Sequence, residues 1–214
     1  MTENWTTWSP ARGAVAACVV AHGAGNDSHT PFLDGVAEGL VAGRVSCLRF
    51  DFPYARAGKR GPDRPPVLLS AWREALEVAA KRAKGLPLVA SGKSLGGRMA
   101  SLLAAEEGEA FAARALVFFG YPLHAPGRSD APRTEHLARV IVPMLFIEGT
   151  ADPLARFDLV EETVRSLGTM ARLHTVRGGD HSFRVRGRKR PDGEIGLELG
   201  ATAADFVRDV TGSG

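Results

Sequence analysis

The chain has 214 residues, of which 44% are hydrophobic and 24% are charged, and its formal net charge is +3. This length suits one α/β domain with a buried core, so we treat residues 1–214 as a single domain. The charge excess is too mild to indicate a nucleic-acid partner. The longest apolar run, Ala14 to Ala21, is shorter than the roughly 18 residues of a membrane span, so none is expected.

The same apolar run lies near the start of the chain behind Arg12, so a secretory signal is the alternative to a core strand. The residues before it are not basic, and the run is short and rich in alanine. We therefore interpret it as a strand and expect a cytoplasmic protein. Cys18 and Cys47 both fall in predicted core strands, where buried free thiols are expected rather than a disulfide framework.

Apolar runs and helical patterns alternate along the rest of the chain. Buried strands are predicted at 15–20, 45–50, 86–90, 115–119, 144–147 and 172–176. Helices are predicted between 32 and 41 and at 69–80, 98–105, 159–167 and 197–210. Alternating strands and helices with right-handed crossovers form a mostly parallel sheet with helices on both faces. The predicted fold class is therefore α/β.

Ligands of such sheets bind at the carboxyl ends of the strands, and one strand end carries a recognisable motif. Gly92-Lys93-Ser94-Leu95-Gly96 follows the third strand and precedes a helical pattern. G-x-S-x-G in this context is typical of a nucleophile elbow, a turn in which side chains two residues from the serine would collide with the strand and helix. Ser94 is the predicted nucleophile, and a glycine-rich helix start is the alternative.

A serine needs a base to attack a carbonyl, and the base needs an orienting acid. His181 follows the sixth strand and is the predicted base, while Asp152 follows the fifth and is the predicted acid. Glu148 and Asp180 are the alternative acids, although Asp180 should point away from the ring of its immediate neighbour. The chain order Ser, Asp, His is that of α/β hydrolases rather than of chymotrypsin or subtilisin.

An oxyanion intermediate needs two N–H donors. Leu95 follows the nucleophile and supplies one, and Ala24 in the loop after the first strand supplies the other. His22 in that loop is interpreted as a structural histidine, with a place in the substrate pocket as the alternative. The remaining histidines are expected on the surface or in loops: His29, His124, His136 and His174.

The other strand ends bear on the substrate. Five apolar or aromatic residues line an acyl or aryl pocket or, equally, pack as core at the top of the sheet: Phe52, Tyr54, Tyr121, Leu123 and Phe183. Segment 122–140 has room for about one short helix, so a minimal lid and an open site are expected. The basic run Arg184–Arg190 is either a solvated loop or a rim that attracts an anionic ester, helped by Lys93 and Arg98.

Five separated blocks together resemble the α/β-hydrolase superfamily: His22–Gly25, Arg49–Tyr54, Gly92–Gly97, Gly149–Pro153 and Gly179–Phe183. More narrowly, the chain resembles small bacterial hydrolases related to dienelactone hydrolase and to the hydrolase-like domain of a chromatin-regulator (NSL complex) subunit. Dienelactone hydrolase has a cysteine where this chain has Ser94, so the resemblance does not extend to its substrate.

The sequence therefore predicts a serine hydrolase that cleaves esters or thioesters of small carboxylic acids through an acyl-enzyme. The alternative is a non-catalytic module of the same fold that binds a ligand or a protein partner, as the chromatin-regulator resemblance permits. The sequence holds no Walker motif, dinucleotide fingerprint or cluster of metal ligands, so no cofactor and no metal are expected. The oligomeric state is left open.

Overall fold

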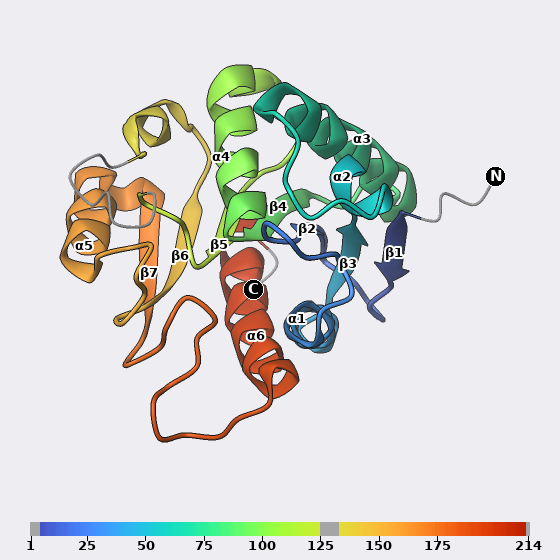
Figure 1. The fold of residues 1–214 in the computed structure, drawn as a ribbon. Helices are drawn as coiled ribbons and strands as arrows, with labels where there is room; N and C mark the ends of the chain where they lie inside the picture. The colour runs from blue at the N-terminus through green and yellow to red at the C-terminus, as the bar shows by residue number, and fades with distance from the viewer. Residues whose placement is uncertain (1–4, 125–132, 213–214) are drawn as a thin grey trace.

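The computed structural model describes residues 5–124 and 133–212. Seven strands form one sheet in the order β1-β3-β2-β4-β5-β6-β7 (Figure 1). β1 pairs antiparallel with β3, and every other pairing is parallel. The strands are β1 (Thr6–Ser9), β2 (Ala16–Ala21), β3 (Val45–Phe50), β4 (Leu88–Lys93), β5 (Leu116–Phe119), β6 (Met144–Gly149) and β7 (Ala171–Val176).

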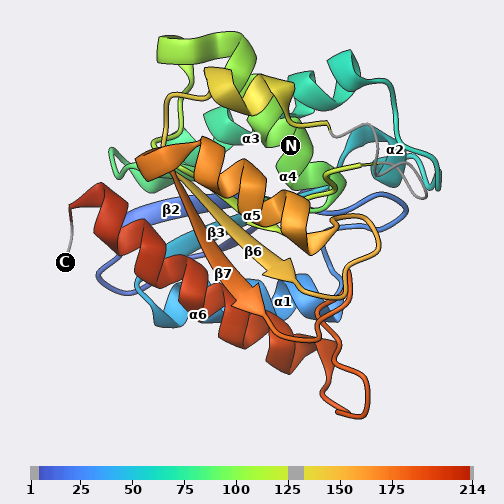
Figure 2. The same ribbon diagram turned by 90° about the vertical axis from the view of Figure 1, so that its left-hand side faces the viewer.

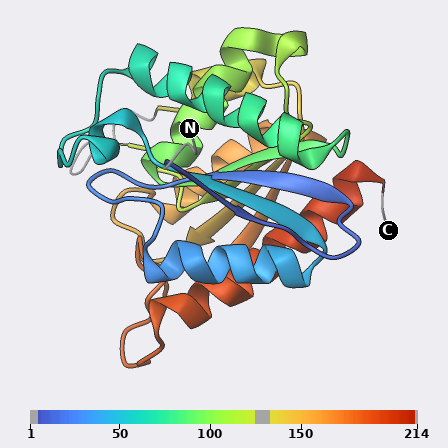
Figure 3. The same ribbon diagram turned by 90° about the vertical axis from the view of Figure 1, so that its right-hand side faces the viewer.

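Helices cover both faces of the sheet, α1 and α6 on one face and α3, α4 and α5 on the other (Figures 2 and 3). The α-helices are α1 (Pro31–Ala42), α2 (Pro53–Arg56), α3 (Pro65–Ala83), α4 (Leu95–Glu107), α5 (Phe157–Ser166) and α6 (Asp192–Thr211). Short 3-10 turns occur at η1 (Gly108–Ala110), η2 (Glu135–Arg139) and η3 (Gly168–Met170). No helix among the described residues is long and apolar enough to cross a membrane.

The sheet separates two hydrophobic cores, as strands that are buried on both faces require. Phe50, Trp72 and Phe118 belong to the core beneath α3 and α4, and Phe32 and Phe119 belong to the core beneath α1 and α6. The parallel strands end at one edge of the sheet, so the residues that follow β4, β6 and β7 lie close together.

The predicted α/β fold is confirmed, and the predicted strands and helices form within a few residues of the expected bounds. β1 was not predicted, because Thr6-Thr7-Trp8-Ser9 is polar and only half-buried. The short helix predicted within 122–140 corresponds to η2, while 125–132 lie outside the described residues. Cys18 and Cys47 are buried free thiols, as expected.

Two of the histidines expected on the surface or in loops are buried. His124 and His136 are 4% and 7% exposed; His124 does lie in a loop, whereas His136 belongs to η2, so the expectation was wrong for His136. Both lie in the segment between β5 and β6. In the structure the described parts of this segment pack against the end of the sheet and against α4, which buries the two rings.

Candidate active site

Ser94 occupies a strained turn between β4 and α4. Its φ is +50°, a left-handed value that a residue with a side chain rarely adopts. A Cβ placed on Gly92 would lie 2.4 Å from the backbone nitrogen of Gly97, and one on Gly96 would lie 2.7 Å from the carbonyl oxygen of Ala21. Only glycine fits at these two positions, which is the steric condition that the G-x-S-x-G motif predicted.

A hydrogen-bonded chain links Ser94 to His181 and Asp152. The His181 Nδ1–H donates to the Asp152 carboxylate over 2.6 Å, and Nε2 lies 3.0 Å from the Ser94 Oγ. The Asp152 side chain is fully buried, and its other oxygen accepts the Leu154 backbone N–H. Because the carboxylate accepts a hydrogen bond from Nδ1–H, Nε2 is unprotonated and can accept a proton from the serine.

The two alternative acids are engaged elsewhere. The Asp180 carboxylate accepts the backbone N–H groups of Ser182 and Arg184, which fixes the loop that carries His181. The Glu148 carboxylate accepts the backbone N–H of Tyr121, and burial raises its pKa well above the ordinary value. Of the three candidate acids, the structure therefore brings Asp152 to the imidazole.

The loop after β2 is held by a buried histidine. The His22 Nδ1–H donates to the Gly23 carbonyl oxygen over 2.8 Å, and its Nε2 accepts the Phe52 backbone N–H over 3.1 Å. The Tyr54 hydroxyl donates a second hydrogen bond to the same carbonyl oxygen over 3.1 Å. Burial lowers the pKa of His22, so the ring is neutral and fully satisfied. These contacts fit the structural interpretation of His22, and its ring also lines the cavity described below.

Those contacts orient the peptide between Gly23 and Ala24. A trans peptide is planar, so an oxygen that points toward His22 directs the Ala24 N–H the opposite way. A Cβ placed on Gly23 would lie 3.6 Å from the Ser94 Cβ, which places this loop beside Ser94. Leu95 begins α4, so its N–H has no partner within the helix. No local pattern in the sequence indicates this contribution of Tyr54.

The five aromatic and apolar residues at the strand ends are buried in the core. None is more than 2% exposed, which favours packing at the top of the sheet over the lining of a substrate pocket: Phe52, Tyr54, Tyr121, Leu123 and Phe183. Phe52 stacks against Tyr54, and Tyr121 meets Phe118 edge to face. These contacts support the loops that carry the site.

A cavity of about 210 Å³ opens beside Ser94 on the α1 side of the sheet, and we call it the Lys93 cleft. His22, Gly23, Thr30, Phe32, Lys93 and Ser182 are among the residues that line it. The Lys93 Nζ is buried without a hydrogen-bond partner among the described residues. Burial lowers its pKa to about 8, although the Glu148, Asp152 and Asp180 carboxylates oppose the shift.

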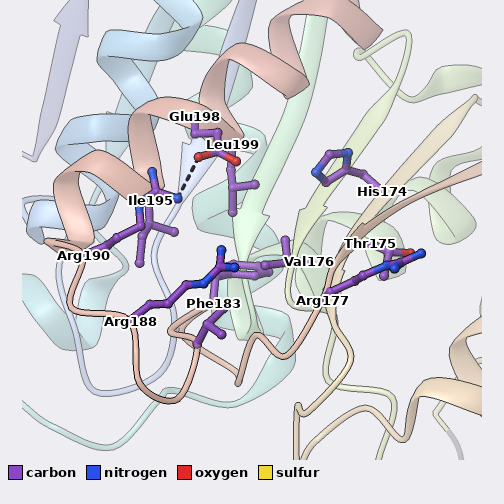
Figure 4. A pocket seen from close by; sticks show the side chains of 11 residues that line it. His174, Thr175, Val176, Arg177, Phe183, Arg188, Arg190, Ile195, Glu198 and Leu199 are labelled. Atoms are coloured by element: carbon purple, nitrogen blue, oxygen red, sulfur yellow. Dashed lines mark ion pairs between the residues drawn. The ribbon is translucent and has the colours of Figure 1, made fainter.

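The basic run Arg184–Arg190 is divided between two places. Arg184 reaches the edge of the Lys93 cleft, where Asp192 neutralises it through two hydrogen bonds of 2.8 and 2.6 Å. Arg188 and Arg190 line a different cavity, of about 310 Å³, between β7 and α6 (Figure 4). Arg190 forms an ion pair there with Glu198. Arg188 and Arg190 therefore face a cavity that does not include Ser94 among its lining residues.

A second serine–histidine pair, which no pattern in the sequence indicated, joins Ser101 of α4 to His136 of η2. The Ser101 Oγ is 2.8 Å from the His136 Nε2, and the Tyr121 hydroxyl lies 3.2 Å from the same nitrogen. Ser101 is fully buried and donates its proton to the Arg98 carbonyl oxygen. Burial, followed by the positive charges of Arg98 and Arg139, lowers the pKa of His136 to about 4. A histidine with so low a pKa is a poor base at neutral pH.

Comparisons with known proteins agree with this architecture. A dienelactone hydrolase from Anabaena variabilis is 22% identical, with a TM-score of 0.72 over 96% of this chain and 91% of that chain. An α/β serine hydrolase homologue from Coxiella burnetii is 15% identical, with a TM-score of 0.72 over 94% and 90% of the two chains. An α/β serine hydrolase without a lid from Xanthomonas campestris is 18% identical, with a TM-score of 0.66 over 92% and 88%.

At these identities the likeness to the solved structures concerns the fold alone. The resemblance to the chromatin-regulator domain stays a prediction. The alpha/beta hydrolase domain family matches residues 14–207, which is most of the chain. This protein, with its mostly parallel sheet and its strained serine between β4 and α4, belongs to the alpha/beta hydrolase family.

Proposed function

We propose that this protein is a serine-dependent hydrolase of esters or thioesters of small carboxylic acids. The hydrogen-bonded chain from Ser94 through His181 to Asp152 carries the proposal. His181 takes the Ser94 proton as Oγ attacks the carbonyl carbon, and the buried carboxylate stabilises the imidazolium that forms. His181 then returns the proton to the departing oxygen or sulfur, which leaves an acyl-enzyme. A water molecule, deprotonated by the same histidine, releases the acid.

Two backbone N–H groups are proposed to stabilise the oxyanion, those of Leu95 and Ala24. The start of α4 supports the first, because the N–H groups of the first helical turn have no helical acceptor and the helix dipole favours negative charge there. The orientation of the Gly23 carbonyl toward His22 and Tyr54 supports the second. Each such donor contributes about 3 kcal/mol to transition-state stabilisation in a dry site.

We assign the acyl group of the substrate to the Lys93 cleft. The cleft adjoins Ser94 through Gly23, and its volume of about 210 Å³ suits a small acyl group rather than a long chain. Phe32 offers an apolar wall, while Lys93 and Thr30 offer polar groups. The aromatic residues that are buried in the core take no direct part in this assignment.

The test is labelling with a fluorophosphonate, followed by peptide mass spectrometry. We expect phosphonylation at Ser94 alone, because only a serine with a base and an anion hole reacts readily. Ser101 is the matched control, since it also contacts a histidine but lies fully buried. Ser94→Ala should abolish both labelling and the hydrolysis of p-nitrophenyl acetate, whereas Ser101→Ala should keep both. A folded wild-type protein that takes no label would favour a binding module instead.

A further inference from the structure

A third cavity with a charged lining lies between α4 and η2, on the opposite face of the sheet from the Lys93 cleft. Its volume is about 340 Å³, and its lining residues are Arg98, Leu102, Arg133, Glu135, His136 and Arg139. We call it the arginine hollow. It places three guanidinium groups and a single carboxylate around one open space, so its lining carries an excess of positive charge.

These arginines lack the partners that many other arginines of the chain have. Arg73 binds Glu106 and Glu107, and Arg172 binds Asp209. In contrast, the side chains of the three arginines of the hollow form no ion pair and no hydrogen bond within residues 5–124 and 133–212. Three unpaired cations that share one hollow indicate a place for an anion.

The lack of a hydrogen-bond partner is clearest at Arg98. Its Nε is buried and has no hydrogen-bond partner among the described residues. Burial lowers the pKa of Arg98, and the positive charge of Arg133 lowers it further. An unsatisfied buried N–H of a cation is costly, and a like charge nearby adds to the cost. An anion in the hollow would satisfy the guanidinium and screen the repulsion.

The chemistry of the lining selects the kind of anion. Guanidinium groups bind phosphoryl oxygens through paired hydrogen bonds, and several of them together match a dianion better than a single carboxylate. His136 is neutral at pH 7, because burial and the neighbouring arginines lower its pKa to about 4, so the positive charge of the lining comes from the arginines alone. We propose that the arginine hollow binds a phosphoryl group, carried by the substrate or present as free phosphate.

The arginine hollow lies along α4 from Ser94. Arg98 follows Ser94, the residue that caps α4, by four residues, so it lies about 6 Å further along the helix axis. The Lys93 cleft, assigned to the acyl group, lies on the other face of the sheet. A substrate-borne phosphoryl group would therefore belong to the leaving alcohol or thiol. This choice of source rests on the proposed function, whereas phosphate binding itself does not.

The first test is calorimetric titration of the full chain with inorganic phosphate. We expect saturable binding to the wild type that weakens about tenfold or more in Arg133→Gln/Arg139→Gln, since each arginine contributes charged hydrogen bonds. Both residues are exposed, so these changes do not threaten folding. Arg165→Gln, at an exposed site on α5, is the matched control and should bind phosphate like the wild type. No binding, or equal binding by the double variant, overturns the proposal.

The second test separates the two sources. S-acetyl phosphopantetheine and S-acetyl pantetheine differ only in one phosphoryl group. If the substrate carries that group, the wild type prefers the first thioester in kcat/KM, and free phosphate raises its KM alone. If free phosphate is the ligand, both thioesters are hydrolysed alike and phosphate alters both rates. A preference for the phosphorylated thioester that survives Arg133→Gln/Arg139→Gln contradicts the assignment to this hollow.

Ser94→Ala keeps the two proposals apart. This variant should lose hydrolysis of both thioesters and still bind inorganic phosphate, because Ser94 does not line the hollow. Phosphate binding in a protein that hydrolyses neither thioester would overturn the proposed function and support the anion site. Hydrolysis that depends on Ser94 in a protein that binds no phosphate would support the proposed function and overturn the anion site.

Discussion

The Tyr54 hydroxyl and the Gly23 carbonyl oxygen are joined by a hydrogen bond of 3.1 Å, although 31 residues separate them in the chain. His22 donates to the same oxygen, so two side chains fix one peptide plane. The backbone N–H on the far side of that plane belongs to Ala24, the proposed oxyanion donor. In the proposed mechanism the tyrosine thereby acts on the reaction through the backbone, without touching the substrate.

Tyr54→Phe should lower kcat for p-nitrophenyl acetate about fivefold with little change in KM, because a less firmly held N–H donor stabilises the transition state less while ground-state binding hardly changes. The loss of one hydrogen bond is worth about 1 kcal/mol. Tyr121→Phe is the control, since the Tyr121 hydroxyl contacts Ser101 and His136 instead. Equal kcat values in the two variants would argue against a role for Tyr54 in positioning.

Asp152→Asn should reduce kcat by roughly 10⁴-fold, because an amide favours the wrong imidazole tautomer. Asp180→Asn keeps the Asp152–His181 bond and should retain most of the turnover. Steady-state kinetics on both variants, with circular dichroism to check folding, show which carboxylate orients His181. Loss of turnover in Asp180→Asn combined with normal turnover in Asp152→Asn would assign the acid to Asp180.

Lys93 should make the stability of the protein depend on alkaline pH. Its pKa is about 8 in the folded state and 10.5 ordinarily, because burial disfavours the charged form. Between these values the unfolded chain binds a proton that the folded chain does not, so stability rises with pH. Below pH 8 both states are charged, and the buried ammonium costs on the order of 3 kcal/mol.

Urea unfolding of the wild type and of Lys93→Met across this pH range measures the effect. The variant should be the more stable protein at pH 7, and the difference should shrink as the pH approaches 10.5. Lys81→Met, at an exposed position on α3, should follow the wild type throughout. Parallel curves for the wild type and Lys93→Met would show that the ammonium is solvated.

The basic run should have little influence on catalysis. Arg188 lines the cavity between β7 and α6, and Asp192 neutralises Arg184, so the field at Ser94 owes little to either. Replacing Arg186, Arg188 and Lys189 with glutamine should leave the salt dependence of kcat/KM unchanged for an anionic ester. A flattened salt response would restore the interpretation of the run as a rim of the site.

Local patterns in the sequence predicted most of the fold and the three residues of the hydrogen-bonded chain. Apolar runs mark buried strands, and the glycines around Ser94 mark a turn whose sterics admit nothing larger. Once the strands are parallel, the order of the chain brings Asp152 and His181 to the same edge. These predictions require only the spacing of apolar residues along the chain and the parallel pairing of the strands.

Other features depend on contacts between distant residues and were not predictable in this way. The buried setting of His136 depends on Ser101, 35 residues earlier, and on Tyr121. The arginine hollow likewise unites Arg98 on α4 with residues of η2. In the sequence these arginines are scattered, and no pattern sets them apart from solvated ones.

β7 is an edge strand of the sheet, and this affects how the molecule loses activity on heating. β7 is bonded to β6 alone, and His181 lies five residues beyond its last residue. Edge strands of a sheet open locally at a lower free energy than central strands. Amide protons of β7 should exchange with solvent before those of β4, and each opening carries the imidazole away from Ser94. Thermal inactivation should then begin several degrees below the cooperative melting of the sheet.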